Sequence, residues 1–231
     1  RMDTLPAASM VLEALIRTIE PKTLTFSGFG MREGQLLQIL PDKLREKDPL
    51  IDACKSFSDR TGRFALHGNE ILEWMGPLFL EEKSAEKRLR FAACLLSDIG
   101  WNEHPDYRAE HAFHRVLRIP FAGLTHANRV LLAEAVYVRY NGDPKSKIVS
   151  PVRSLLDQGQ QAWVHVVGLA LRLAHTLSGS APGLLAQSKL IVGTKKLTLK
   201  VPEGSEMFVS ETVERRLKTL ARSVGLKHSI D

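Results

Sequence analysis

The segment Gln160–Leu177 carries apolar residues around most of its circumference when it is arranged as an α-helix. A helix on a protein surface keeps a polar face, whereas a helix that is apolar all round is buried. Three other segments, 63–80, 84–99 and 125–140, place apolar residues at helical spacing and can surround it. The sequence therefore predicts a mainly α protein with a helical bundle at its centre.

The composition and the cysteine usage are those of an ordinary folded protein. Of the 231 residues, 44% are hydrophobic and 25% are charged. Cys54 and Cys94 fall on the apolar sides of predicted helices, which is typical of reduced core thiols in a cytoplasmic protein. The longest apolar run, near Trp163–Ala170, is far shorter than the roughly 18 residues of a membrane span, and no signal peptide is visible. We therefore expect a cytoplasmic protein without a membrane span.

The charge balance favours a polyanionic partner. The chain has 32 Lys and Arg against 26 Asp and Glu, a net charge of +6, which attracts polyanions and releases their counterions on binding. The alternative is a surface whose charges are merely solvated. We find no internal repeat, no P-loop, no cysteine-based zinc signature and no serine nucleophile elbow. Because the aromatic residues lack the close spacing of an RNA-binding sheet, the sequence argues against a nucleic acid partner.

The N-terminal segment reads as the order strand, glycine turn, helix. After a helix over residues 4–20, the β-prone run Lys22–Phe26 precedes the turn Ser27–Gly34, and a second helix follows over 35–40. Such a turn lets backbone amides approach a phosphate, and the Arg32 guanidinium adds a planar set of donors. One strand and one and a half helices cannot cover a sheet, so this segment is expected to be the end of an α/β domain.

The same segment resembles the end of the catalytic region in the exopolyphosphatase and guanosine pentaphosphate phosphohydrolase family. The resemblance lies in Asp3–Leu15 and Phe26–Gly34, and the run Gly-Met-Arg-Glu-Gly from Gly30 is its most specific part. It implies an actin-like domain that precedes this point, carries the main catalytic residues and binds most of the Mg²⁺, together with a homodimer. It also implies that four residues of the turn bind the substrate phosphates, namely Gly28, Gly30, Arg32 and Glu33.

A second resemblance concerns the junction between two predicted helices within 91–118. The run Leu95–Gly100 is similar to the Leu-His-Asp-Ile-Gly motif of HD-type metal phosphohydrolases, with histidines upstream and downstream. Ser97 stands where that superfamily has its histidine, and its neutral hydroxyl is a poor metal ligand. His175 stands where a final aspartate is expected. The resemblance therefore implies a degenerate HD-like domain that binds substrate without hydrolysing it.

Few of the metal ligands that the HD pattern requires are present in this sequence. A stable site needs several correct donors at once, each of them oriented by neighbouring groups. The sequence therefore argues against a bound transition metal, although a recruited zinc or manganese site stays an alternative. The candidate ligands are His67, Asp98 and His111, with His104 and His175 as further imidazoles that could be recruited.

Basic residues also surround a loop after the helix 125–140. The loop 141–147 is rich in turn residues and carries Lys145 and Lys147, with Arg139 before it and Arg153 after it. We expect Arg139, Lys145 and Lys147 to bind a polyanion; the alternative is a solvated connection.

The C-terminal part predicts a hairpin followed by a helix. Residues 190–192 and 197–201 alternate apolar and polar side chains around a turn, and a helix over 210–224 can cover them as a small α+β unit. The expected domains are the end of an actin-like domain, an HD-like helical domain and this unit, at 1–40, 41–180 and 181–231.

Three functions are consistent with the sequence. The leading hypothesis is the C-terminal region of an exopolyphosphatase-like phosphohydrolase, which releases terminal phosphate from inorganic polyphosphate or guanosine pentaphosphate. In that case this portion binds substrate and is inactive alone. The second is an autonomous HD-type metal-dependent nucleotide phosphohydrolase that uses His67, Asp98, His111 and His175. The third is a non-enzymatic basic module that binds RNA or another polyanion.

Overall fold

The computed structural model describes residues 2–24, 27–61, 68–202 and 209–231. The chain divides into two compact units, Arg1–Glu46 and Lys47–Asp231. The second unit contains the helical bundle and the C-terminal sheet, so it is the unit in which a core can be traced. Its helices confirm the mainly α fold that the apolar spacing predicts.

The N-terminal unit consists of the helices α1 (Leu5–Ile19), α2 (Met31–Ile39) and α3 (Asp42–Arg45). None of these helices buries a residue, and the apolar stripe of α1 remains exposed, with Met10 at 70% and Ile19 at 67% of their full exposure. Residues 22–24 form no strand, because the described part of this unit offers no second strand to pair with. Phe26, the end of the predicted strand, lies outside the described residues.

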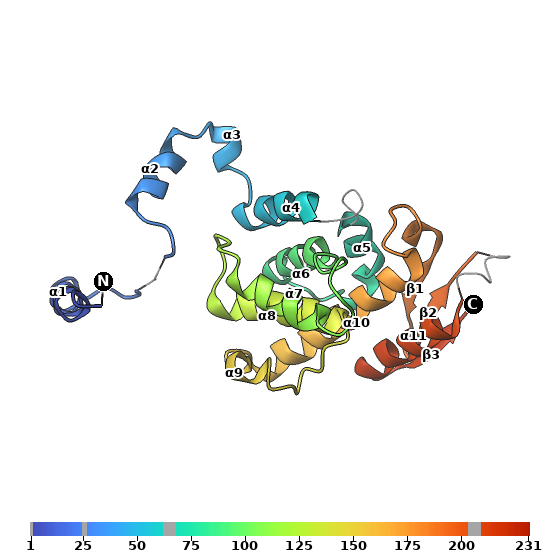
Figure 1. The fold of residues 1–231 in the computed structure, drawn as a ribbon. Coiled ribbons are helices and arrows are strands. Elements are labelled where there is room, and N and C mark those ends of the chain that lie inside the picture. Colours follow the sequence, from blue (N-terminus) through green and yellow to red (C-terminus); the bar gives the residue numbers. More distant parts are fainter. Residues whose placement is uncertain (1, 25–26, 62–67, 203–208) are drawn as a thin grey trace. The chain divides into compact units, whose positions relative to one another are not determined.

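The bundle is built around the helices α8 (His126–Arg139) and α10 (Gln158–Ser178), which pack along each other (Figure 1). α8 also packs on α7 (Arg108–Arg118). Val167–Leu171 in α10 are all buried, and since this stretch exceeds one helical turn, α10 is covered on every side there. This confirms the buried central helix that the sequence predicts.

A second layer of helices covers the first part of the bundle. α6 (Ser84–Leu96) packs on α8 and on two helices that precede it, α4 (Pro49–Thr61) and α5 (Gly68–Trp74). The short helices η1, α9 and η2 complete the unit at Gly76–Leu78, Ser150–Arg153 and Leu185–Gln187. None of the described helices has the length and apolarity that crossing a membrane requires.

The two cysteines lie in the bundle as free, buried thiols. Burial raises the pKa of Cys54 and of Cys94 to about 12. Both thiols therefore stay protonated near neutral pH, so they act as apolar core side chains, as their helical positions indicate.

The C-terminal sheet has three strands, one more than the sequence predicts. β1 (Lys189–Val192) and β2 (Lys196–Lys200) form the expected antiparallel hairpin, and β3 (Lys227–Ile230) pairs with β2 in parallel. The helix α11 (Glu211–Ser223) packs on the sheet and on α10 (Figure 1). After α11, Gly225 turns the chain with a φ of +73°, which lets it return as β3.

The closest approach of α8 and α10 depends on Gly168. A Cβ atom on this residue would lie 2.5 Å from the Cβ of Val138 and 2.9 Å from the carbonyl oxygen of Ala135. Atoms of neighbouring residues do not approach this closely, so the absence of a side chain at Gly168 lets the two helices cross in contact.

Replacement of Gly168 by alanine tests this crossing. Because the two helices have to separate, Gly168→Ala is expected to lower the free energy of unfolding by about 1–3 kcal/mol, despite the better helix propensity of alanine. Urea denaturation followed by circular dichroism measures the change. Gly76→Ala is the matched control, since its Cβ meets open space, and it should change stability by no more than about 0.5 kcal/mol. Equal stabilities of the two variants would contradict a tight crossing.

Candidate functional site

The turn after α6 places Ser97 and Asp98 at the centre of the bundle. α6 ends at Leu96, and the chain turns immediately, since the amide of Ile99 donates to the carbonyl of Leu96 and that of Trp101 to the carbonyl of Asp98. Ser97 is 1% exposed and lies against His175 of α10, which is 7% exposed. The two positions that depart from the HD pattern are therefore in direct contact.

The hydrogen bonds of Ser97 define the tautomer of His175. The Ser97 hydroxyl donates its proton to the carbonyl of Cys94 at 2.7 Å, and its oxygen lies 2.7 Å from Nε2 of His175. Since a hydroxyl has one proton, Nε2 has to carry the hydrogen and donate it to Ser97. On the other side of the ring, Nδ1 lies 2.7 Å from the hydroxyl oxygen of Ser180. Both ring nitrogens are therefore engaged by hydroxyl groups.

Asp98, which is partly exposed, also contacts this network. Its Oδ1 lies 3.5 Å from the hydroxyl oxygen of Ser180, 3.9 Å from Nδ1 of His175 and 3.2 Å from Nη2 of Arg139. Two hydroxyl groups and the Arg139 guanidinium thus provide partners for the imidazole and the carboxylate. Nowhere in residues 2–24, 27–61, 68–202 and 209–231 do three His, Cys, Asp or Glu side chains gather as a metal site would need.

Arg139, at the end of α8, is held in place by two neighbours. Its guanidinium lies over the ring of Tyr140 at 4.1 Å and donates to Asp98. The Tyr140 hydroxyl in turn accepts the amide of Gly100 at 2.9 Å, which fixes the ring beneath the guanidinium. Stacking on an aromatic ring reduces the freedom of the arginine, so its remaining donors keep one direction.

Further arginines from α10 and α11 lie near Arg139. Arg216 donates to the backbone carbonyl of Arg172 at 3.4 Å, and the Arg172 guanidinium donates to the side chain of Asn141. Burial, together with the positive charges of Arg139 and Arg215, lowers the pKa of Arg172. Burial and the charges of Arg172, Arg139 and Arg215 lower the pKa of Arg216 to about 10. Each of these side chains therefore senses the others as like charges.

We name these residues the arginine cluster: Arg139, Arg172, Arg215 and Arg216. Among the described residues, Asp98 is the one carboxylate that forms an ion pair with it. The Nε atom of Arg216 is buried and finds no acceptor in the described part of the chain. Positive charge is therefore concentrated here beyond what the described carboxylates neutralise, and an anion with several acceptor oxygens would complete it.

Comparison with known proteins identifies the family to which this chain belongs. Residues 50–230 match the family described as the C-terminal part of exopolyphosphatase, which covers more than half of the chain. The chain belongs to the exopolyphosphatase C-terminal family. It is also similar to Retrograde regulation protein 2 of Saccharomyces cerevisiae (strain ATCC 204508 / S288c), with 28% identity over 148 residues. That match covers 62% of this chain and 25% of the yeast protein, so the chain spans about a quarter of the length of that curated relative.

The predicted metal ligands do not form one site in the described structure. His111 lies on the solvent side of α7, where its Nδ1 is 3.0 Å from the Glu103 carboxylate and its ring stacks on Tyr107. His104 is equally exposed and lies near Asp106. His67 lies outside the described residues, so the metal site composed of His67, Asp98 and His111 stays a prediction.

In this member of the exopolyphosphatase C-terminal family, the basic residues in and after the predicted loop differ in their surroundings. Lys145 and Lys147 are exposed and remain candidates for anion binding. Arg153 is engaged elsewhere, because it donates to the carbonyl of Pro144 and to Gln161 and lies 3.5 Å from Glu134. It ties the loop to the bundle, so it is a structural residue.

Glu134 is the most buried carboxylate that the structure describes in the bundle. The residue is 0% exposed, and neither of its carboxylate oxygens accepts a hydrogen bond from a described residue. Burial raises the pKa of its carboxyl group, an effect that the nearby charge of Arg153 partly opposes. The group is therefore held in a setting that favours its protonated form.

The predicted phosphate-binding turn belongs to the N-terminal unit. The amide of Gly30 donates to the Glu33 carboxylate at 2.7 Å, which closes the first turn of α2, and Arg32 is exposed. A Cβ atom on Gly28 would meet nothing within 4 Å. Glu33 therefore has a local capping role, and substrate binding by Gly28, Gly30, Arg32 and Glu33 stays a prediction.

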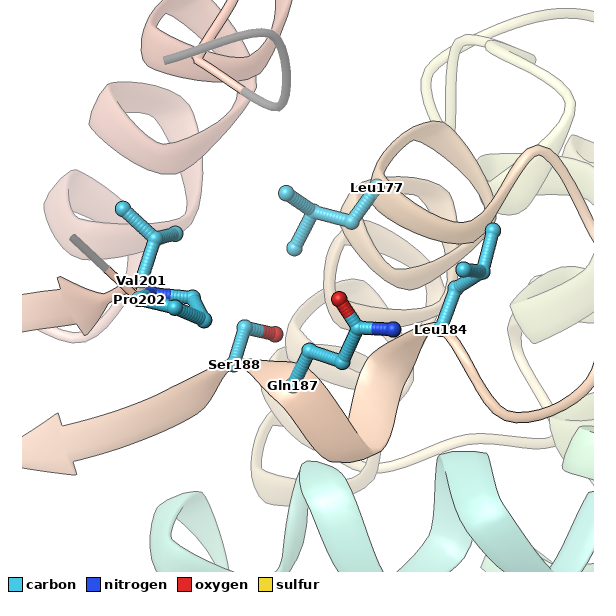
Figure 2. A pocket seen from close by; sticks show the side chains of 6 residues that line it. All are labelled: Leu177, Leu184, Gln187, Ser188, Val201 and Pro202. Carbon is cyan, nitrogen blue, oxygen red and sulfur yellow. The ribbon is translucent and has the colours of Figure 1, made fainter. Parts of the chain in front are cut away.

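Two hollows in the second unit do not include the arginine cluster. Figure 2 shows a narrow apolar recess between Leu177 and Leu184 on one side and Val201 and Pro202 on the other. Its volume of about 10 Å³ admits one water molecule at most. A larger hollow of about 180 Å³ lies among the first turns of α6, α8 and α10, around Trp163. Of the cluster, Arg215 is exposed and Arg139, Arg172 and Arg216 are partly exposed, so the cluster borders on solvent.

Of the four arginines in the cluster, Arg139 alone is among the residues predicted from the sequence, although two of the others leave a signal there. Arg172 is a charge within the otherwise apolar second half of α10, and a charge at such a position needs a partner or a ligand. Arg216 directly precedes Leu217, an inward residue of α11, so it lies at the edge of the buried face. What brings the two together is the packing of α11 on α10, which local spacing does not reveal.

Removal of the imidazole tests the hydroxyl network. His175→Ala removes the ring that hydrogen-bonds to both Ser97 and Ser180, so the free energy of unfolding is expected to fall by about 1–3 kcal/mol. Thermal and urea denaturation measure this loss. His111→Ala is the control on the exposed face of α7, and its effect should stay within about 0.5 kcal/mol. A wild-type stability for His175→Ala would show that the buried network contributes little.

Proposed function

We propose that this chain is the C-terminal region of an exopolyphosphatase-like phosphohydrolase and that it binds the phosphate chain of the substrate. The substrate is inorganic polyphosphate or guanosine pentaphosphate, from which the whole protein releases terminal phosphate. Membership of the exopolyphosphatase C-terminal family supports the reaction class. The arginine cluster is the observation that carries the binding role, because it joins buried and exposed guanidinium groups around one described carboxylate.

Phosphate chains match the chemistry of this cluster. A guanidinium donates two parallel hydrogen bonds to one phosphate group, and a polyphosphate offers about one negative charge for each phosphate along its length. Burial and the repulsion between the arginines lower the pKa values of Arg172 and Arg216, and a bound phosphate would relieve the repulsion. The phosphate also provides an acceptor for the buried Nε of Arg216. Lys145 and Lys147 would extend the positive path along the loop that begins at Asn141.

The bundle is proposed to bind substrate without cleaving it. Ser97 and His175 hydrogen-bond to each other, so two positions that hold a metal in HD-type hydrolases are engaged with each other. The described residues do not offer three convergent metal ligands, and we derive no step through a metal from them. The Mg²⁺ requirement and the homodimer that the family resemblance implies are part of this proposal, as is the cytoplasmic location that the cysteine usage indicates.

A comparison of binding with turnover tests the proposed function. The 231-residue chain should bind long-chain polyphosphate, because it carries the arginine cluster, yet release almost no phosphate from it. The full-length protein should do both. Calorimetry measures the binding, and a colorimetric assay measures the phosphate released. Robust turnover by the isolated chain would contradict the proposal, and so would an RNA affinity equal to the polyphosphate affinity.

Substitution of Arg216 tests whether the cluster is the binding site. Arg216→Gln removes a half-buried charge, so the affinity for tripolyphosphate should fall about tenfold, as expected for a charge-assisted hydrogen bond. The slope of log K against log salt concentration should decrease by about one. Arg222→Gln removes an exposed charge from the same helix and is the matched control, with a change of about twofold at most. Equal effects of both variants would mean diffuse attraction instead of a defined site.

A further inference from the structure

Asp98 is placed between the arginine cluster and the buried hydroxyl network. Its side chain is 19% exposed, and one oxygen, Oδ1, makes the contacts with both groups. Oδ1 lies 3.2 Å from Nη2 of Arg139, 3.5 Å from the hydroxyl oxygen of Ser180 and 3.9 Å from Nδ1 of His175. Asp98 therefore has two sets of partners, one charged and near the surface, the other buried.

Of the contacts that Asp98 makes with Arg139, Ser180 and His175, the ion pair with Arg139 is the shortest, yet it is long for its kind. Oδ1 of Asp98 lies 3.2 Å from Nη2 of Arg139, which is longer than the usual 2.7–2.9 Å of a charge-assisted hydrogen bond. The guanidinium itself is held by Tyr140 at 4.1 Å. The donors of Arg139 therefore stay in place when their acceptor changes, and a stronger acceptor can take the position of the carboxylate.

We propose that Asp98 is the internal counter-anion of the arginine cluster and that a phosphate group of the ligand displaces it from Arg139. This inference rests on the proposed function. In the ligand-free protein, Asp98 partly neutralises Arg139, the member of the cluster with which it forms an ion pair. On binding, a phosphate oxygen replaces Oδ1 of Asp98 at Nη2 of Arg139, and Asp98 keeps its place beside Ser180.

In such an exchange, the Asp98 carboxylate raises the stability of the ligand-free protein and lowers its affinity for phosphate. An internal carboxylate stabilises the folded, ligand-free cluster because it lies among cations. The same carboxylate repels an incoming phosphate and competes with it for Arg139, so it lowers the affinity. Asp98 would thus set how much negative charge a ligand must carry before it binds at this surface.

The variant Asp98→Asn tests this exchange, because it keeps the size of the side chain and removes its charge. Tripolyphosphate is the probe, and isothermal titration calorimetry at several salt concentrations is the measurement. We expect about fivefold tighter binding at low salt, which corresponds to the loss of one repulsive charge pair near the surface. The salt slope should rise by about one, because the ligand-free variant holds one more solution anion that binding releases.

Asp106→Asn is the matched control. It makes the same charge change at a side chain that is 77% exposed in the loop before α7, and its affinity should stay within about twofold of the wild type. A merely structural role of Asp98 would weaken binding or leave the salt slope unchanged. A steeper slope of log K against log salt concentration in Asp98→Asn therefore distinguishes a counter-anion role of Asp98 from a structural role.

A second measurement needs no variant and uses the folded wild type. The side-chain carboxyl carbon of Asp98, observed by NMR during a tripolyphosphate titration, should shift with saturation as its ion pair breaks, whereas that of Asp106 should stay in place. The counter-anion role of Asp98 would be overturned by an Asp98 signal that does not shift at saturating ligand, or by weaker binding of a folded Asp98→Asn variant. If Arg216→Gln still weakens binding in that case, the proposed function survives. Failure of the wild type to bind tripolyphosphate would overturn both.

Discussion

Gly168 and Val138 meet where α10 crosses α8, and the positions of the functional side chains follow from that crossing. Arg172 and His175 lie four and seven residues after Gly168, on the same face of α10. Arg139 directly follows Val138 on α8. The close approach of two backbones therefore brings one arginine of each helix to the same end of the bundle. It also sets His175 against the turn that carries Ser97 and Asp98.

The junction after α6 shows how a metal-site pattern can be replaced without leaving buried groups unpaired. A serine hydroxyl is too short and too weak a donor to substitute for a metal-bound imidazole, but it accepts the Nε2 proton of His175. His175, which stands where the HD pattern has an aspartate, supplies that proton. The two departures from the HD pattern therefore compensate each other through one hydrogen bond, which the sequence shows only as two separate losses.

The fold was predictable where local spacing decides it, and the site was predictable only in part. The apolar circumference of α10 and the alternation in β1 and β2 are local signals, so the bundle and the hairpin follow from them. β3 has a weak pattern and forms because β2 offers it an edge. Arg139 and Asp98 stand out within motifs, whereas Arg172 and Arg216 acquire their role through packing between helices that are distant in sequence.

Glu134 gives the bundle an unusual response to acid. Most paired carboxylates have a lowered pKa when folded, so acid weakens the proteins that contain them. Burial raises the pKa of Glu134 instead, so the folded chain keeps this proton to a higher pH than the unfolded chain does, whose carboxyl titrates near pH 4.3. Folding between these two values takes up a proton, and the contribution of this carboxyl to stability is lost as the pH rises through the folded pKa. Protonation of Glu134 at mildly acidic pH therefore favours the folded state of the bundle.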